Sequence, residues 1–354
     1  MARSKASMTA QRTSWALPGP VQTLAPGVLL CAAISLAAVG VQRAEERFFG
    51  HGYVEALVLA ILAGAALRSS WTPGVAFRKG IAFSGKTLLE IAVMLLGASI
   101  STAALAAAGA PLLLGILLVV AASLVISYGL SRALGLSATM GLLIASGNAI
   151  CGNSAIAAVA SVIEADAEDI ASSIAFTAIL GVIVVLTLPV AAGLLRLDEM
   201  RYGALAGLTV YAVPQVLAAT VPVGPIATQL GTVVKLVRVM ILGPLVFGVA
   251  LARRATRGAP GPAVRFSIWR FVPWFVVGFV GLALLRAAGV IPERALAPIQ
   301  TTTAILTIMS MAALGLGVDI RQLRHVGARV TAAVTLSIMA LATMSYVLIS
   351  LLAP

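Results

Sequence analysis

Two basic side chains, Lys235 and Arg238, lie inside a long apolar stretch at residues 226–251. Their spacing of three residues places both on one face of a helix. A charge in such surroundings is costly, so it usually faces a cavity or a counter-ion. Arginine binds an oxyanion through two parallel N–H groups, whereas lysine supplies a point charge. The pair indicates either an anion site or a structural ion pair, for which Glu90 is the most available acid.

A second group of polar residues interrupts the apolar stretch at 137–164, where two Gly-Asn pairs occupy positions 147–148 and 152–153. Glycine and asparagine are poor helix formers. We therefore expect a discontinuous helix whose second half starts near Asn153 and whose free N–H groups face an anion. The alternative is that these small residues permit close helix packing. The candidate substrate-binding residues here are Asn148, Cys151, Gly152, Asn153 and Ser154.

Two further stretches carry weaker signals. Tyr211 and Gln215 share a helix face at a spacing of four residues, and Pro214 either breaks or kinks that helix. Thr302 belongs to a run of three threonines, which can also bond to their own helix. We count Tyr211, Gln215 and Thr302, with Lys235 and Arg238, as substrate-binding candidates, and Glu90 with Lys235 as candidates for coupling.

The composition defines the surroundings of these residues. Of 354 residues, 60% are hydrophobic and only 10% are charged, and the mean hydropathy is +1.07. An ordinary soluble domain has about 25% charged residues, so these values exclude a soluble globular enzyme and a disordered chain. The lipid bilayer must surround most of the chain. The net charge of +12 does not indicate nucleic acid as a partner, because cytoplasmic loops of membrane proteins collect basic residues.

The sequence carries no catalytic or cofactor signature. Two histidines and two cysteines are too few for a histidine-rich metal site or a disulfide framework. The phosphate-binding loop of ATP-driven motors is absent, as are the zinc-protease and serine-hydrolase motifs. Cys151 has no histidine near it in the sequence to activate its thiol. We expect no enzyme, no metal and no cofactor.

Hydropathy predicts an all-α polytopic membrane protein with about eleven transmembrane helices, because one span needs about 20 apolar residues. Lysine and arginine in alternate loops split 18 to 4, as the positive-inside rule expects for a cytoplasmic N-terminus and an outer C-terminus. The acidic run at 164–169 falls on the poorer, outer side. The predicted spans are residues 24–41, 52–67, 87–108, 111–131, 137–164, 170–195, 202–220, 226–251, 268–287, 298–318 and 328–352.

One helix followed by two five-helix repeats would account for eleven spans, and the second repeat would be inverted because each repeat has an odd number of spans. The predicted divisions are 1–49 for the tail and first helix, 50–198 for the first repeat and 199–354 for the second. In this register the fifth span pairs with the tenth. Short sequence echoes favour other pairings and leave the register open. We expect the core helices of the repeats to be broken.

The stretch Ser146–Val159, with the sequence SGNAICGNSAIAAV, resembles the bacterial sulfate exporter family of integral membrane proteins. Val234–Val239 followed by Pro244, and Leu96-Gly97 preceded by Lys86, match the same family. The resemblance covers about residues 50–354. It implies a relation to bile-acid symporters and sodium–proton antiporters, with inverted five-helix repeats, a panel domain, a core domain with crossed broken helices, and an elevator-like motion.

The chain departs from this family at the seventh predicted span. Relatives often carry a histidine where Tyr211 stands, and Ala-Gln where this chain has Pro214-Gln215. Tyrosine hardly titrates near neutral pH. A proton-coupling role for that position is therefore not carried over from the family.

Together these observations predict a secondary transporter, in direction an exporter, of a small anion such as sulfate, sulfite or a sulfonate, by alternating access. A proton or sodium gradient would drive it from the bacterial inner membrane, and a homodimer is compatible with the sequence. The alternative is a cation/proton antiporter-like exchanger that switches through a Lys235–Glu90 pair. A membrane-embedded enzyme lacks a catalytic motif here, and a sensor lacks a soluble signalling domain.

Overall fold

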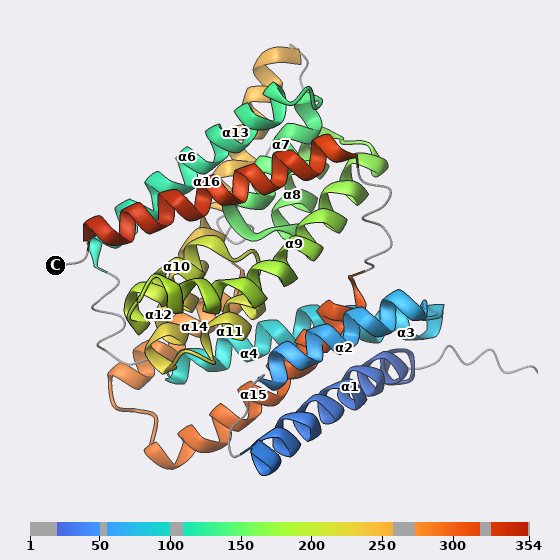
Figure 1. The fold of residues 1–354 in the computed structure, drawn as a ribbon, viewed down its shortest axis with the longest axis vertical. Coiled ribbons are helices and arrows are strands. Elements are labelled where there is room, and N and C mark those ends of the chain that lie inside the picture. The colour runs from blue at the N-terminus through green and yellow to red at the C-terminus, as the bar shows by residue number, and fades with distance from the viewer. Residues whose placement is uncertain (1–19, 50–54, 100–108, 258–272, 319–326, 353–354) are drawn as a thin grey trace, which may run out of the picture.

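The computed structural model describes residues 20–49, 55–99, 109–257, 273–318 and 327–352. All regular structure in these residues is helical (Figure 1). The helices are α1 (Pro20–Phe49), α2 (Ala56–Ser70), α3 (Val75–Phe83), η1 (Ser84–Leu88), α4 (Leu89–Leu96), η2 (Gly97–Ser99), α6 (Ala110–Ala133), α7 (Ala138–Ser146), η3 (Gly147–Cys151), α8 (Asn153–Ile163), α9 (Ala167–Leu194), α10 (Glu199–Thr209), α11 (Val213–Thr220), α12 (Pro225–Met240), α13 (Leu242–Arg257), α14 (Trp274–Ala287), α15 (Glu293–Leu316) and α16 (Ala328–Leu352).

Seven helical segments in the described residues are long and apolar enough to cross a membrane, and shorter apolar helices accompany them. The predicted class, an all-α polytopic membrane protein, is therefore confirmed. The third segment begins at Val75, whereas the sequence predicts a start at residue 87. Its charged residues Arg78, Lys79 and Lys86 lie within helix instead of in a loop, because a helix of lower hydropathy still packs along α1.

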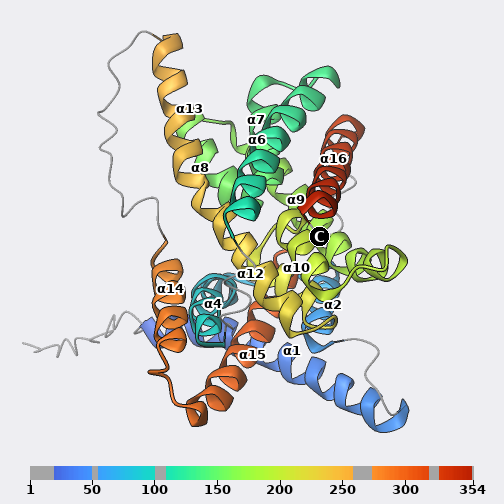
Figure 2. The same cartoon turned by 90° about the vertical axis from the view of Figure 1, so that its left-hand side faces the viewer.

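The helices form two groups that each pack mainly within themselves. The α15 group contains α1–α4, α14 and α15, and the α12 group contains α6–α13 and α16. Figures 1 and 2 show them as two neighbouring bodies. Each group takes helices from both predicted repeats, and α15, which the predicted register pairs with the broken fifth span, is continuous. The repeats and their boundaries stay predictions.

Glycines let helices in both groups approach until their backbones touch. A Cβ on Gly64 of α2 would lie 2.5 Å from the Ala312 carbonyl oxygen of α15, and one on Gly315 would lie 2.2 Å from that of Ile61. Gly203 of α10 meets the backbone of Ala227 in α12 in the same way, at 2.6 Å. Such small-residue contacts are how helices associate in lipid, where apolar burial gives little advantage.

The stretch predicted as the fifth span is a helical hairpin. In it α8 folds back along α7, so that Leu143 belongs to one cluster with Val159 and Ile163. A Cβ on Gly147 would lie 2.9 Å from Ile156. The turn is at Gly152, whose φ of 64° suits glycine and few other residues. Both ends of this hairpin therefore lie on one side of the molecule.

An ion pair between distant segments supports the same conclusion. At the end of α8, Glu164 Oε2 lies 3.6 Å from Arg253 Nη1 of α13, which also donates to the Val162 carbonyl at 3.0 Å. The sequence predicts Glu164 and Arg253 on opposite sides of the membrane. That prediction is wrong, because a hairpin returns the chain to the side from which it came.

The stretch predicted as the seventh span is a second hairpin. The hydroxyl of Tyr202 in α10 donates to the Ala219 carbonyl of α11 at 2.7 Å, across 17 residues of sequence. Between the two helices, residues 210–212 are not helical. The sequence predicts that Tyr211 and Gln215 share a helix face. That prediction is wrong, because Tyr211 lies outside any helix. The two hairpins start from opposite ends of the α12–α13 segment, since α8 packs on α13 and α10 packs on α12 (Figure 2).

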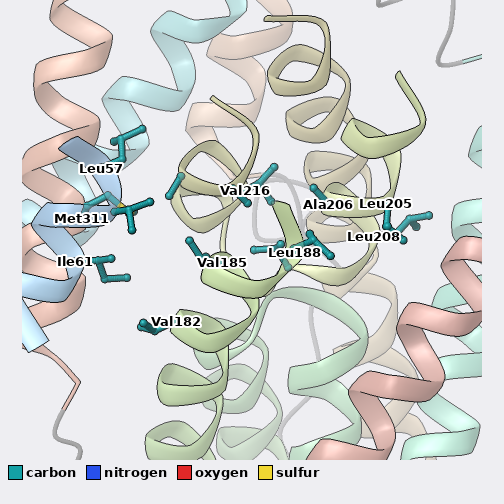
Figure 3. Packing of buried hydrophobic residues seen from close by; sticks show 14 of the residues in the cluster. Leu57, Ile61, Val182, Val185, Leu188, Leu205, Ala206, Leu208, Val216 and Met311 are labelled. Carbon is teal, nitrogen blue, oxygen red and sulfur yellow. The ribbon is translucent and has the colours of Figure 1, made fainter. Parts of the chain in front are cut away.

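An apolar layer lies where the two helix groups meet. Leu57, Ile61 and Met311 of the α15 group face Val182 and Val216 of the α12 group across it (Figure 3). All of them belong to one continuous cluster of buried apolar residues. The N-terminal tail and most of the polar connection at 253–270 lie outside the described residues.

Candidate functional site

The tips of the two hairpins meet beside α12, and Lys235 of α12 joins them. Its ammonium group donates to the Ile150 carbonyl of the first hairpin at 2.5 Å and to the Val210 carbonyl of the second at 2.8 Å. Lys235 has no exposed surface. One side chain therefore satisfies carbonyls that both broken helices leave without a helical partner.

Arg238, one helical turn further along α12, extends this arrangement. Nε and Nη2 donate to the Ala149 carbonyl at 3.1 and 2.9 Å, and Nη2 also reaches the Asn148 carbonyl at 3.0 Å. On the second hairpin, Nη1 donates to the carbonyls of Gly207 and Val210 at 2.9 and 3.4 Å. The guanidinium is fully buried and thus spans both hairpins.

These contacts assign the two cations to the negative ends of helix dipoles. The C-terminal ends of η3 and α10 both point at Lys235 and Arg238, and cations are favourable there. Neither side chain is among the residues that line the two cavities described below, of about 670 and 590 Å³. The structure thus brings Lys235 and Arg238 to backbone carbonyls of the two hairpins, and the substrate contact that the sequence predicts for them stays a prediction.

The N-terminal ends of the returning helices α8 and α11 open onto a cavity of about 670 Å³ between the two helix groups. The facing wall comes from α2, α3, η1 and the end of α15. Polar or charged side chains on the cavity wall are Arg68, Thr72, Arg78, Asn153, Ser154, Thr177, Tyr211 and Gln215, and Cys151 and Gly152 lie among them. Cys151, Gly152, Asn153, Ser154, Tyr211 and Gln215, predicted as site residues, are thus brought together here.

Hydrogen bonds fix the orientation of the amide side chains around the tips. The Ala212 N–H donates to Gln215 Oε1 at 3.2 Å, and the Thr177 hydroxyl donates to Asn153 Oδ1 at 2.7 Å. Deeper in the protein, the Tyr211 hydroxyl donates to Asn148 Oδ1 at 2.8 Å. The Asn148 amide nitrogen is buried and has no hydrogen-bond partner among the described residues.

The charge of the cavity favours an anion. Two arginines, Arg68 and Arg78, lie on its wall, and no carboxylate does in the described residues. The first N–H groups of α8 and α11 have no intrahelical acceptor and carry partial positive charge. Helix N-termini are a common way to bind phosphate, sulfate or carboxylate groups.

Two of the predicted residues lie away from this cavity. Glu90 Oε2 accepts a hydrogen bond from Trp274 Nε1 at 2.9 Å, and no contact to Lys235 forms in the described residues. Thr302 is exposed on α15, and its hydroxyl bonds back to the Pro298 carbonyl at 2.8 Å. Thus Thr302 and the proposed Glu90–Lys235 coupling pair are not part of the site geometry.

Sequence reasoning missed Arg68, Arg78 and Thr177. The arginines read as loop residues on the cytoplasmic side, and their approach to the hairpin tips depends on how the two helix groups pack. Thr177 lies in a strongly apolar helix, and threonine alone is a weak signal there. Among the residues that the structure describes, no group of three histidine, cysteine or acidic residues could hold a metal ion.

Fold and site define a multi-pass helical membrane protein with a cavity between its two helix groups that carries polar side chains. Residues 26–334 match the family described as conserved hypothetical protein 698, and the chain belongs to this family. It is 55% identical over 350 residues to a UPF0324 membrane protein of Bradyrhizobium diazoefficiens, which covers 99% of both chains. Similar proteins of Agrobacterium fabrum (53% identical, 93% of both chains) and Bacillus cereus (31%, 83% of this chain and 86% of the relative) carry the same description. No solved structure matches the chain.

Proposed function

We propose that this protein is a secondary transporter, acting as an exporter, of a small inorganic or organic anion such as sulfate, sulfite or a sulfonate. The observation that carries the proposal is the cavity at the hairpin tips. Two helix N-termini, amide donors from Asn153 and Gln215, and the guanidinium of Arg78 converge on it. This combination favours negative charge from every side.

A second cavity supports transport rather than simple binding. It measures about 590 Å³ and is lined by the start of α2, the first half of α15 and the base of the second hairpin. The first cavity is lined by the opposite ends of α2 and α15. The apolar layer at Leu57, Ile61, Met311 and Val216 lies between the two cavities along these helices. Alternating access would open this layer from one side at a time, driven by a proton or sodium gradient.

Flux of radiolabelled sulfate in proteoliposomes, under an imposed pH or sodium gradient, tests the proposal. Asn153→Ala and Gln215→Ala each remove a donor at the cavity and should lower flux about tenfold. Thr302→Ala is the matched control, because Thr302 is exposed and bonded to its own helix, and its flux should match that of the wild-type protein.

Two results would contradict the proposal. Saturable sodium or proton flux with no anion requirement would favour the cation/proton exchanger instead. Sulfate flux that is equal in Asn153→Ala, Gln215→Ala and wild-type protein would move the anion path away from the hairpin tips. The structure lends the exchanger no support, since Glu90 bonds to Trp274 and not to Lys235.

A further inference from the structure

The Gln215 side chain presents its amide donor to the first cavity, because its amide oxygen accepts a hydrogen bond from the backbone. Gln215 is only 5% exposed and lines the cavity, and its oxygen is taken by the Ala212 N–H. A backbone N–H can only donate, so this bond leaves the Gln215 amide nitrogen as the polar atom without a partner in the described residues. Asn153 differs, because the Thr177 hydroxyl at 2.7 Å from its oxygen also lies within hydrogen-bond distance of the Ser173 and Ile174 carbonyls, so a backbone N–H fixes the amide orientation only at Gln215.

A glycine in α9 makes room for this orientation of Gln215. A Cβ on Gly181 would lie 2.5 Å from Gln215 Nε2 and 2.8 Å from Oε1. Any larger residue would push the carboxamide away from its place. Because the displaced atoms are the end of a flexible side chain, such a substitution should shift Gln215 and leave the helices in place.

Donors without acceptors discriminate between anions by their protonation. An anion that has lost every proton offers only acceptors and can satisfy the Gln215 amide nitrogen and the helix N–H groups beside it. An anion that keeps an O–H group brings a donor to groups that can only donate, so it loses a hydrogen bond there at a cost. The same logic lets a polar pocket reject a ligand that differs by one hydrogen-bonding group.

We propose that Gln215, oriented by the Ala212 N–H and accommodated by Gly181, makes this cavity selective for oxyanions that carry no O–H group over those that carry one. This inference rests on the proposed anion function and narrows its substrate class to fully deprotonated oxyanions. Gln215 is here a specificity-determining residue.

Methyl sulfate and methyl phosphate form a matched pair of probes. A phosphate monoester loses its second proton near pH 6, so at pH 5 methyl phosphate has one negative charge and an O–H group. Methyl sulfate has one negative charge and no O–H group at the same pH. Binding of each to the purified full-length protein in detergent can be measured by calorimetry at pH 5 and again at pH 8.

The wild-type protein should bind methyl sulfate about tenfold more tightly than methyl phosphate at pH 5, and this preference should vanish at pH 8. In Gly181→Ala and in Gln215→Ala the preference at pH 5 should fall to about twofold or less. Gly193→Ala is the control for the glycine, because it lies in the same helix and a Cβ there meets nothing within 4 Å. It should keep the wild-type preference, with an unchanged melting temperature.

Each outcome of this experiment is decisive. Equal binding of both probes at pH 5 overturns the selectivity inference and leaves the anion function standing. A preference that persists unchanged in folded Gly181→Ala and Gln215→Ala protein shows that other groups select the anion, and overturns the role of Gln215. Absence of binding for both probes at both pH values contradicts the proposed function itself.

Discussion

Lys235 and Arg238 stabilise this protein through hydrogen bonds to backbone carbonyls. Two positive charges without an acid beside them would be prohibitively costly in a buried place. Here five carbonyls, all from the broken ends of two hairpins, take the place of carboxylates. The two buried charges are therefore stabilised only while the hairpin tips keep their places. The same tips present the N-terminal ends of α8 and α11 to the cavity.

Replacement of Arg238 should unfold the centre of the molecule. Arg238→Met keeps the volume and removes every donor, leaving the carbonyls of Asn148, Ala149 and Gly207 buried without a partner, at a cost of about 3 kcal/mol or more. Thermal unfolding in detergent measures the loss. Arg201→Met is the control, because Arg201 pairs with exposed Asp198 at the surface. Equal melting temperatures for both variants would show that the cation does not hold the hairpins.

Several site residues could be found from the sequence and others could not. Asn153 and Gln215 are polar, sit in apolar stretches and are next to helix-breaking residues, so their types reveal them. Lys235 and Arg238 can be identified in the same way. Their hydrogen-bond partners cannot, because these are backbone carbonyls, which every residue carries. The role of Gly181 cannot be predicted from the sequence, because this glycine acts only by leaving space for the Gln215 side chain.

At the scale of elements, the hairpins are the main difference between sequence and structure. Two half-length helices joined at a break have the same total hydropathy as one full span. An average of hydropathy along the sequence therefore predicts that the chain crosses the membrane there. The breaks near Asn153 and Pro214 are confirmed, because glycine, asparagine and proline act locally. Whether the chain continues or reverses at such a break depends on tertiary packing, as between Tyr202 and Ala219.

The turn at Gly152 should be essential for the first hairpin. Gly152→Ala would place a side chain at a φ of 64° and a Cβ 3.2 Å from that of Tyr211, so we expect a loss of about 1–2 kcal/mol. Gly129→Ala in α6 meets nothing within 4 Å and should stabilise slightly through helix propensity. Urea or thermal unfolding in detergent compares the two. A Gly152→Ala protein as stable as Gly129→Ala would contradict the hairpin turn.

The hairpin also predicts which residues are accessible from the same side. Single cysteines at exposed Ala133 and Asp166, in a Cys31→Ser/Cys151→Ser background, flank the first hairpin and should react with a membrane-impermeant thiol reagent from one side only, and from the same side. Glu293→Cys, at the start of α15, should react from the opposite side. Labelling of Ala133→Cys and Asp166→Cys from opposite sides would contradict the hairpin and support the membrane-crossing helix that the sequence predicts.

For the whole molecule, the hairpins change how many basic residues lie on each side of the membrane, but the same side keeps the excess. Arg196 and Arg201 move to the outer side, and the basic residues then divide 16 to 6 instead of 18 to 4. The positive-inside rule still favours a cytoplasmic N-terminus, because two hairpins in place of two spans reverse only α9 between them and leave the direction of the spans before and after unchanged. Sequence therefore predicts the overall orientation despite two wrong local assignments, and that orientation stays a prediction.

The packing of the two helix groups creates two cavities that the sequence does not reveal. Two cavities lie at opposite ends of α2 and α15, with an apolar layer between them. The groups combine helices from distant parts of the chain, such as α2 with α15 and α6 with α16 (Figure 1). Periodicity and composition identify each helix, but they hold no information on which distant helices pair.

We propose that an anion binds at the hairpin tips and not at the buried cations. A crystal structure with selenate, a heavy analogue of sulfate, would locate the bound anion, because anomalous scattering identifies the position of selenium without ambiguity. We expect a peak within hydrogen-bond distance of the start of α8 and of the Asn153 and Gln215 amide nitrogens. A peak against Lys235 and Arg238, or a well-occupied selenate that avoids the first cavity, would contradict it.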